Sequence, residues 1–460
     1  METKLIEEFF DKSTKSCKLI SVVGDSLIDE YYQIKSERIS PEFPIQILNS
    51  PNENPSKVVA GGAANVVRQF QNLHAETRLV SIIDHYAYEI FNSNINVDYC
   101  KVHWKAETPK KKRFYHGEFP LVRWDCETKN FNMSDSELNE AFKELKIPES
   151  DVIIFSDYNK GMFSQNWFKK YLKNKITIVD PKKDIEKWKG CTIFKPNNTE
   201  AKNLSGKTNE KDQLAYFMKK LGCKSVIITQ SERGVVGCVD SPDNIFFIPA
   251  YNKKPDVRCV IGAGDAFIAF LSLSIANGLS CHKAAKIAFN AGISYVKNKH
   301  NEPVNCLNLL ESCMDFNKII KNPLILSKRN EKLAFTNGCF DILHEGHIQT
   351  LKFAKSKGDK LVVALNSDKS VKKLKGSNRP INNLEKRMNV ISQLGFVDYV
   401  VSFEEETPLE IIKQINPDVL VKGGDYKKEN IVGNDVVLET YTCKYINGSS
   451  TTNLIEKIKN

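Results

Sequence analysis

Short apolar runs rich in β-branched residues alternate with amphipathic stretches through most of the chain. This alternation is typical of parallel strands joined by crossover helices, so it predicts an α/β fold. Two consecutive helices are expected at residues 266–277 and 282–296, and Gly278 suits the end of the first. The strands predicted before these helices are residues 18–23, 152–156, 176–179, 192–194, 225–229 and 235–239.

The pattern becomes irregular at residues 297–332, where Pro303, Pro323 and many Asn and Lys residues interrupt it. We interpret this segment as a linker. Helical stretches then separate most of a second set of strands, which is typical of a compact Rossmann-like unit. These strands are predicted at residues 333–336, 361–365, 399–403, 419–421 and 436–441. Two α/β domains are therefore expected, residues 1–320 and residues 331–460.

The composition agrees with a folded protein of at least two domains. The chain has 460 residues, and single cores stop growing at about 250–300 residues. Its longest nearly apolar stretch, residues 266–276, is shorter than the ~20 residues that a membrane-spanning helix needs. The acidic start at Glu2 lacks the basic and apolar parts of a secretory signal. We therefore expect a cytoplasmic protein with no membrane partner.

Cysteine usage and charge narrow the function further. The 12 cysteines form no C-x-x-C pair, so we expect reduced thiols and no thiolate metal site. The net charge of +10 suits an enzyme with phosphorylated substrates. No nucleic-acid-binding motif accompanies this charge, so no nucleic acid partner is expected. The basic cluster at residues 110–113 is interpreted as a solvated surface run.

The first candidate site is a glycine-rich helix start that ends in a carboxylate. Gly262, Ala263 and Gly264 precede Asp265 at the beginning of the apolar helix. Their backbone N–H groups would lie where the helix dipole is positive, which favours an anion. An aspartate there can accept a proton from a hydroxyl while the amides stabilise a transferring phosphoryl group. The alternative is an ordinary N-capping turn.

Two further motifs agree with a phosphoryl-transfer site. Gly24-Asp25 follows a predicted strand, and Gly61-Gly62-Ala-Ala-Asn65 combines glycines with a hydrogen-bonding amide. In order and spacing, these motifs resemble the ribokinase-like sugar kinase family over residues 15–310. The alternative for the glycines is tight helix–strand packing. The resemblance implies a catalytic base at Asp265, an anion hole at Gly262, Ala263 and Gly264, and sugar-phosphate binding by Asp25, Gly61, Gly62 and Asn65.

The same family has an N-x-x-E motif that organises Mg²⁺ and its waters around ATP. The segment Asn197-Asn198-Thr199-Glu200 resembles it, and its oxygen ligands suit a hard cation. Residues 155–161 and 179–182 resemble one branch of the family, the heptose 7-phosphate kinases. Arg123, in Arg-Trp-Asp-Cys-Glu, also matches that branch and is a candidate phosphate clamp. The alternative is that these are solvated polar residues at strand ends.

The glycine-rich helix start departs from the family's Asp-x-Thr-Gly-Ala-Gly-Asp pattern at two positions, Cys259 and Ile261. In the family, the first Asp is associated with a monovalent-cation site. A cysteine there removes a hard oxygen ligand, so activation by a monovalent cation is left open. The departure also motivates the hypothesis of an impaired kinase half that serves as a dimerising scaffold.

The second candidate site contains two histidines behind a strand. His344 and His347 stand three residues apart at a predicted helix start, so their imidazoles can point the same way. Hydrogen-bonding imidazoles or imidazoliums there would stabilise the negative charge that develops at an α-phosphate. A metal pair is the alternative, but no third ligand lies at metalloprotease spacing.

This segment resembles the H-x-G-H nucleotidyltransferases, and the resemblance extends over residues 332–460. The match includes Asn366-Ser-Asp368 and Lys422-Gly-Gly424-Asp425-Tyr426. In such enzymes a sugar phosphate attacks the α-phosphorus in line and pyrophosphate leaves. Lys375 and Arg379 could neutralise the triphosphate, and the alternative is that they belong to a solvated Lys-rich turn. The ATP-binding residues that the resemblance implies are Thr336, Asn337, Gly338, Phe340, Lys375, Arg379, Ser450 and Thr451, with His344 and His347 as catalytic residues.

A sugar kinase joined to an H-x-G-H transferase resembles the bifunctional heptose 7-phosphate kinase and heptose 1-phosphate adenylyltransferase family. The resemblance implies that ATP phosphorylates D-glycero-β-D-manno-heptose 7-phosphate at O1. It further implies that adenylyl transfer from ATP to heptose 1-phosphate yields ADP-heptose for bacterial surface glycans such as lipopolysaccharide. Mg²⁺ and a homodimer formed through the kinase domain are also expected. Three alternatives stay open: an impaired kinase half, a non-catalytic sugar-phosphate or nucleotide-binding regulator, and the same chemistry with CTP or another sugar.

Overall fold

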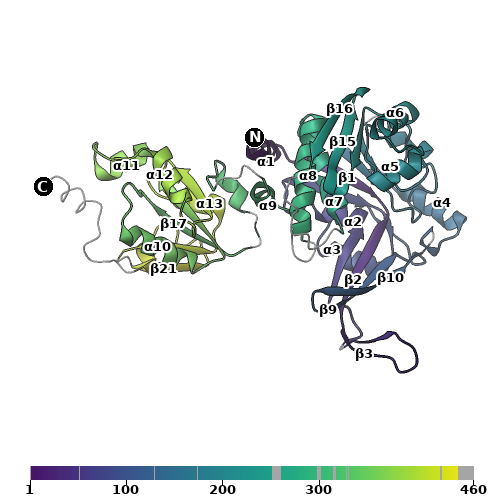
Figure 1. Cartoon of the computed structure of the whole chain (residues 1–460), viewed down its shortest axis with the longest axis horizontal. Helices are drawn as coiled ribbons and strands as arrows, with labels where there is room; N and C mark the ends of the chain where they lie inside the picture. The colour runs from purple at the N-terminus through teal and green to yellow at the C-terminus, as the bar shows by residue number, and fades with distance from the viewer. Residues whose placement is uncertain are drawn as a thin grey trace. The chain divides into compact units, whose positions relative to one another are not determined.

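The computed structural model describes residues 2–50, 52–128, 130–173, 175–250, 261–297, 302–313, 318–327, 329, 331–424 and 427–443. The chain forms two compact units (Figure 1). The larger unit is Glu8–Val304, and the smaller unit combines Asn305–Asn460 with Met1–Glu7. Both units are α/β, as the sequence predicts. None of the described helices is long and apolar enough to cross a membrane.

An eight-stranded sheet forms the centre of the larger unit, in the order β16-β15-β14-β13-β12-β11-β1-β6. The strands from β14 to β6 run parallel, and β15 and β16 add an antiparallel edge. All six strands that the sequence predicts in this part are confirmed. The strands are β1 (Lys18–Gly24), β6 (Ala75–Val80), β11 (Val152–Ser156), β12 (Ile176–Asp180), β13 (Ile193–Phe194), β14 (Ser225–Thr229), β15 (Gly234–Val239) and β16 (Ser241–Pro249).

Helices cover this sheet, with α7 and α8 on one side and α4, α5 and α6 on the other (Figure 1). Helix α7 is buried from Asp265 to Ser274, which explains why its sequence is apolar all round rather than amphipathic. Its first turn brings Asp265 to the carboxyl ends of the parallel strands. The helices are α1 (Glu2–Lys15), α2 (Ala63–Arg68), α3 (His85–Asn92), α4 (Asp135–Glu144), α5 (Asn198–Ser205), α6 (Glu210–Leu221), α7 (Ala263–Ala276) and α8 (Cys281–Lys297).

A second, four-stranded sheet of order β10-β9-β2-β5 was not predicted. Its strand β9 contains the basic cluster, and Arg113 within it is only 4% exposed because it pairs with Asp29. The interpretation of this cluster as a solvated surface run is therefore wrong for Arg113. The strands are β2 (Ser26–Gln33), β5 (Lys57–Gly62), β9 (Lys110–His116) and β10 (Phe119–Cys126), with the small pairs β3 (Lys35–Ile39) and β4 (Gln46–Asn49), and β7 (Ile82–Ile83) and β8 (Lys101–Val102).

The smaller unit contains a parallel five-stranded sheet of order β19-β18-β17-β20-β21. Its five predicted strands are confirmed, although β21 begins at Glu439 rather than at residue 436. The apolar strands are buried on both faces, as expected for a parallel sheet with helices on its faces. The elements are β17 (Leu333–Gly338), β18 (Lys360–Asn366), β19 (Tyr399–Phe403), β20 (Val419–Gly423) and β21 (Glu439–Cys443), with α10 (Glu345–Lys355), α11 (Asp368–Lys375), α12 (Leu384–Ser392) and α13 (Leu409–Ile415).

Part of the segment that we interpreted as a linker is packed onto the smaller unit. Helix α9 (Cys306–Glu311) ends in Glu311, which accepts hydrogen bonds from Lys360 and from the Tyr399 hydroxyl. The backbone N–H of Ile320 donates to the Val400 carbonyl at 2.9 Å, so this segment extends the sheet beside β19. The linker interpretation is therefore wrong for these residues, and the larger unit ends at Val304.

Candidate active sites

The carboxylate of Asp265 lies at the beginning of α7 and is only 6% exposed. Both of its oxygens accept hydrogen bonds, one from the Asn65 side-chain amide at 2.5 Å and the other from the Tyr158 hydroxyl at 2.8 Å. Burial raises the pKa of Asp265, while the hydrogen bonds from Asn65 and Tyr158 act in the opposite direction. The arrangement is that of a buried base whose charged form is partly stabilised.

The turn before Asp265 has the geometry expected of an anion-binding helix start. Gly262 adopts φ +92°, and a Cβ there would lie 2.5 Å from the Tyr295 hydroxyl oxygen, so only glycine fits without displacement. Ala263 and Gly264 follow in the first turn, where backbone N–H groups have no intrahelical acceptor. This turn can therefore offer amides to a phosphoryl group. Cys259 lies outside the described residues.

A cavity of about 130 Å³ adjoins Asp265. It brings together Asn65 and Gly62, which the sequence analysis selected, and it is also lined by Ile261. Gly61 does not line it, because its backbone packs against Asp29, whose carboxylate oxygen a Cβ would approach to 2.6 Å. Five charged or hydroxyl-bearing residues of the lining were not assigned to the site from the sequence, although Asp29 and Tyr158 lie within motifs that resemble the kinase family. The five are Asp29, Arg68, Lys111, Arg113 and Tyr158.

The structure gives Asp25 a different position from the predicted one. Its side chain is completely buried and accepts backbone hydrogen bonds from Tyr158, Lys160 and Met162 at 2.9, 3.1 and 2.9 Å. Burial and the neighbouring Asp157 raise the pKa of Asp25 to about 6. Asp25 therefore holds the loop after β11 and does not line the cavity; Asp29, four residues later, does.

The predicted phosphate clamp Arg123 is also placed elsewhere. Its side chain is 52% exposed and forms a two-pronged ion pair with Asp125 at 2.6 Å. Its neighbour across the β-ladder is Arg113, which together with Lys111 lines the cavity. Burial, opposed by Asp29 but reinforced by the nearby arginines, lowers the pKa of Lys111. These two residues of β9 place their side chains at the cavity beside Asp265, whereas Arg123 does not line it.

The N-x-x-E segment forms the start of α5. Asn197 and Glu200 satisfy each other's backbone N–H groups as a capping box, and Glu200 also pairs with Lys182 at 2.9 Å. Asn198 accepts a hydrogen bond from Arg233, and Thr199 is exposed. The local role of these residues is therefore helix capping, at the same sheet edge as Asp180.

Acidic groups converge at this edge. Burial raises the pKa of Asp180 to about 6; Lys195, at 3.0 Å, opposes the rise, whereas Glu200 and Asp265 add to it. Asp180 therefore lies near two other carboxylates, and carboxylate oxygens are ligands that suit a hard cation. Among the described residues, however, no three metal-binding side chains are close enough to ligate one ion directly.

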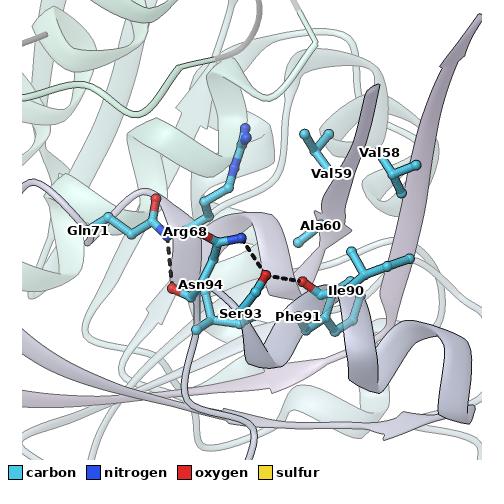
Figure 2. Close-up of a pocket in the computed structure, with 10 residues that line it drawn as sticks. Val58, Val59, Ala60, Arg68, Gln71, Ile90, Phe91, Ser93 and Asn94 are labelled. Atoms are coloured by element: carbon cyan, nitrogen blue, oxygen red, sulfur yellow. Dashed lines mark hydrogen bonds between the residues drawn. The ribbon is translucent and has the colours of Figure 1, made fainter. Parts of the chain in front are cut away.

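A larger cavity of about 300 Å³ lies beside the first, between β5, α2 and α3 (Figure 2). Figure 2 shows hydrogen bonds that link Gln71 to Asn94, Asn94 to Ser93, and Ser93 to the Ile90 carbonyl. Arg68 lines both cavities and donates from its Nε to the Asn65 side-chain oxygen at 3.1 Å. The arginine therefore stands between the two spaces and connects to the Asp265 network.

In the smaller unit, β17 ends in the predicted nucleotide-binding segment. Thr336 is 1% exposed, and Asn337 and Gly338 complete the strand. Phe340 adopts φ +46°, and its ring meets that of His347 edge-on with centroids 5.2 Å apart. The rings of His344 and His347 stack with centroids 3.7 Å apart, which confirms that they point the same way.

Their surroundings favour the neutral form of both histidines. Burial lowers the pKa of His347 to about 4, with further contributions from His344 and Lys375. Burial and then Lys375 also lower the pKa of His344. The Nδ1 atoms of both rings are buried and have no hydrogen-bond partner among the described residues. Neutral imidazoles with unused ring nitrogens are suited to hydrogen-bonding a phosphate.

Arg379 is held by a buried carboxylate. Its Nε donates to Asp341 at 2.5 Å, and the same carboxylate accepts the backbone N–H groups of Ile381 and Asn382 at 2.9 Å. Another nitrogen of this guanidinium, Nη2, is buried and has no hydrogen-bond partner within the described chain. Lys375 is exposed, so the alternative of a solvated Lys-rich turn suits this residue. It does not suit Arg379, whose side chain is tied to Asp341.

Lys422 is a further cation that the sequence analysis did not assign to the site. Its Nζ donates to the Asn337 side-chain oxygen at 3.1 Å, and burial lowers its pKa. The signal in the sequence was a lysine between an apolar strand and two glycines. Ser450, Thr451, Asp425 and Tyr426 lie outside the described residues, so their predicted roles stay predictions.

Comparison with known proteins finds a family match for each half of the chain. Residues 18–300 match the pfkB family carbohydrate kinase model, and residues 335–456 match the cytidylyltransferase-like model. The chain is 36% identical to the bifunctional protein HldE of Nitratiruptor sp., covering 96% of this chain and 99% of that protein. Its identity to the Helicobacter hepaticus bifunctional protein HldE is 37%, with 98% of both chains covered.

Among solved structures, phosphofructokinase-2 from Escherichia coli in complex with potassium covers 64% of this chain and 98% of its own. Its TM-score is 0.51 at 15% identity, a likeness that supports the fold of the larger unit. Full-length identity above one third and both domain matches lead to the same assignment. The chain belongs to the family of bifunctional HldE proteins, in which a pfkB carbohydrate kinase is joined to a cytidylyltransferase-like domain.

Proposed function

We propose that the larger unit transfers the γ-phosphoryl group of ATP to O1 of D-glycero-β-D-manno-heptose 7-phosphate. The product is a 1,7-bisphosphate, and its 7-phosphate must be hydrolysed by a separate phosphatase before the second reaction. The smaller unit transfers an adenylyl group from ATP to the resulting heptose 1-phosphate, which gives ADP-heptose and pyrophosphate. The observation that carries this proposal is the buried Asp265 carboxylate, beside an amide-bearing helix start and a cavity of mixed charge. A base, an anion hole and an acceptor cavity are what phosphoryl transfer to a sugar phosphate needs.

In the kinase reaction, the oxygen of the anomeric hydroxyl attacks the γ-phosphorus of ATP, the hydroxyl proton passes to Asp265, and ADP leaves. Backbone N–H groups of Ala263 and Gly264 stabilise the charge on the transferring group. Asp29 and Asn65 offer hydrogen bonds to the sugar hydroxyls. The phosphate of the acceptor binds to Lys111 and Arg113, since these cations line the same cavity as the base, whereas Arg123 does not.

Mg²⁺ is the cofactor that we propose for both reactions. In the kinase unit, the carboxylates of Asp180 and Glu200 near Asp265 suit a hard cation. With no three direct ligands together in the described chain, these residues would hold the ion through its waters and the ATP phosphates. An ion held there would supply positive charge that neutralises the ATP phosphates.

In the transferase reaction, the oxygen of the sugar 1-phosphate attacks the α-phosphorus of ATP and pyrophosphate leaves. Neutral His344 and His347 donate hydrogen bonds to the oxygens that gain charge. The free Nη2 of Arg379 and the ammonium of Lys375 neutralise the leaving pyrophosphate. Ser450 and Thr451 contribute hydroxyls to the same phosphates in this proposal.

The test uses the full-length protein with Mg²⁺ and ATP, and follows products by phosphorus NMR in two separate reactions. With heptose 7-phosphate we expect ADP and a 1,7-bisphosphate, and with heptose 1-phosphate we expect pyrophosphate and ADP-heptose. Asp265→Asn should lower the first reaction by at least about a thousandfold and leave the second unchanged, and His347→Asn should do the reverse. Failure of the unmodified protein in the first reaction would contradict the kinase assignment.

We also propose that two chains form a homodimer through the kinase unit. The end of β3 and the loop that leads to β4 expose three large apolar side chains, Ile39, Phe43 and Ile45, which are 65%, 68% and 60% accessible. Burying such a patch against a second copy is favourable by about 25 cal/mol per Å².

A cytoplasmic location is part of the proposal, supported by described cysteines that are all free thiols.

A further inference from the structure

Tyr158 follows β11 in a loop whose backbone is fixed from several directions. The Asp25 carboxylate accepts the N–H groups of Tyr158 and of two later loop residues. Asp157 donates its N–H to the Asp180 carbonyl at 3.0 Å, and its carboxylate pairs with Lys187 at 2.8 Å. The backbone at Tyr158 is therefore fixed by contacts within the protein.

The phenol of Tyr158 points at the catalytic base. Its hydroxyl donates to one oxygen of Asp265 at 2.8 Å, and its ring lies under the Lys111 ammonium, 5.5 Å from the ring centroid. Burial, and then the neighbouring Asp265 carboxylate, raise the pKa of Tyr158 well above its ordinary value. The phenol therefore remains protonated, and so remains a donor, throughout the neutral pH range.

The base needs such donors because it is buried. Removing a carboxylate from water favours its protonated form, and a protonated Asp265 cannot accept the acceptor's proton. Only two side-chain donors reach its oxygens among the described residues, Asn65 and Tyr158. Each hydrogen bond stabilises the charged form, and together they fix the plane of the carboxylate.

Resting on the kinase activity proposed above, we propose that Tyr158 is a positioning residue of the kinase site. Its hydroxyl holds the Asp265 carboxylate ionised and oriented to take the proton of the acceptor hydroxyl. Tyr158 itself transfers no proton: the acceptor O–H bond breaks and the new O–H bond forms on Asp265. The loop residues tied to Asp25 carry this tyrosine to the base.

The experiment compares the full-length protein with Tyr158→Phe, measuring kcat/KM of the kinase reaction with ATP and heptose 7-phosphate from pH 5.5 to 9. Removing the donor favours protonated Asp265, so the acidic limb of the profile should move to higher pH. We expect a loss of about tenfold near pH 6 that shrinks towards pH 9, as befits one hydrogen bond to a charged group.

Tyr171→Phe is the matched control. Tyr171 is a half-buried tyrosine of the same unit whose hydroxyl accepts the Ile147 N–H, so its loss tests hydrogen-bond removal away from the base. Its pH profile should not move. Adenylyl transfer by the same chains reports whether the smaller unit is intact, and a thermal unfolding scan reports on the larger one.

A second, shape-conserving change covers the case in which Tyr158→Phe does not fold. Site-specific 3-fluorotyrosine at residue 158 makes the phenol a stronger donor, so the acidic limb should move to lower pH. The inference would be overturned if Tyr158→Phe lowered kcat/KM by the same factor at every pH. It would also be overturned if the acidic limb of the profile moved neither in Tyr158→Phe nor in the 3-fluorotyrosine protein. Absence of sugar phosphorylation by the unmodified protein would instead contradict the proposed function.

Discussion

Two aspartates of the kinase unit show how position decides the use of a buried carboxylate. Asp25 uses both oxygens for three backbone N–H groups and has no surface left for a ligand. Within the described part of the chain, Asp265 receives two side-chain donors, and it borders a cavity. A carboxylate saturated by backbone amides organises a loop, whereas one that faces a cavity can act on a substrate.

In the transferase unit, His347 makes stability depend on pH. Its folded pKa of about 4 lies below its ordinary value of 6.5, so the native state binds fewer protons than the unfolded state between these values. The free energy of unfolding should therefore fall as the pH drops from 6.5 to 4. We expect His347→Asn to flatten this dependence, measured as the thermal unfolding midpoint of the smaller unit.

The control for that measurement is His85→Asn, which changes an exposed histidine of the larger unit. It should leave the slope of the unfolding midpoint against pH unchanged. If His347→Asn retained the full slope, the neutral state of the His347 imidazole would not be the source of the pH dependence.

At the scale of elements, the segment before β17 belongs to the transferase unit. Helix α9 buries Leu307, Leu309 and Leu310, and Glu311 binds both Lys360 and Tyr399. A buried leucine contributes about 1.5–3 kcal/mol, so these contacts are not those of a flexible connection. The apolar positions are too few and too interrupted by Asn and Lys to be distinguished from a linker in the sequence.

We predict that a fragment of residues 305–460 folds better than one of residues 323–460. The shorter fragment lacks α9 and the backbone pairing of Ile320 with Val400, and it exposes the surface that they cover. Its thermal midpoint should be lower by about 10 °C or more, or it should be insoluble. Within the longer fragment, Glu311→Gln should cost about 1 kcal/mol or slightly more. Equal thermal unfolding midpoints for the two fragments would indicate that the segment is a linker.

The elements that could be predicted from sequence are those whose burial is uniform. Strands such as β11 and β18 are buried on both faces and therefore appear as continuous apolar runs. Strand β9 has a different pattern, because Lys111 and Arg113 line a cavity. A run of four basic residues is ordinarily a solvated surface, and only the pairing of β9 with β2 shows otherwise.

For the whole molecule, the exposed β3–β4 pair predicts an assembly of two chains. Phe43→Lys and Ile45→Lys together should convert the dimer to a monomer, because they place charges in the patch that a second copy would cover. Light scattering coupled to size-exclusion chromatography measures the mass. The control is Phe247→Lys, which places a lysine at an exposed apolar residue of β16 outside the patch. A double variant with unchanged mass would place the interface elsewhere.

The sequence by itself determined the α/β class, six of the eight strands in the sheet of the larger unit, all five strands of the smaller unit's sheet, and the short motifs around Asp265 and His347. These features are local, since they depend on periodicity and on residues close together in the chain. The tertiary structure decided which distant residues meet them. Tyr158 reaches Asp265 across 107 positions, and Arg113 reaches Asp29 across 84. Such pairs leave no periodic signal, because their proximity arises only when the strands that carry them are packed together.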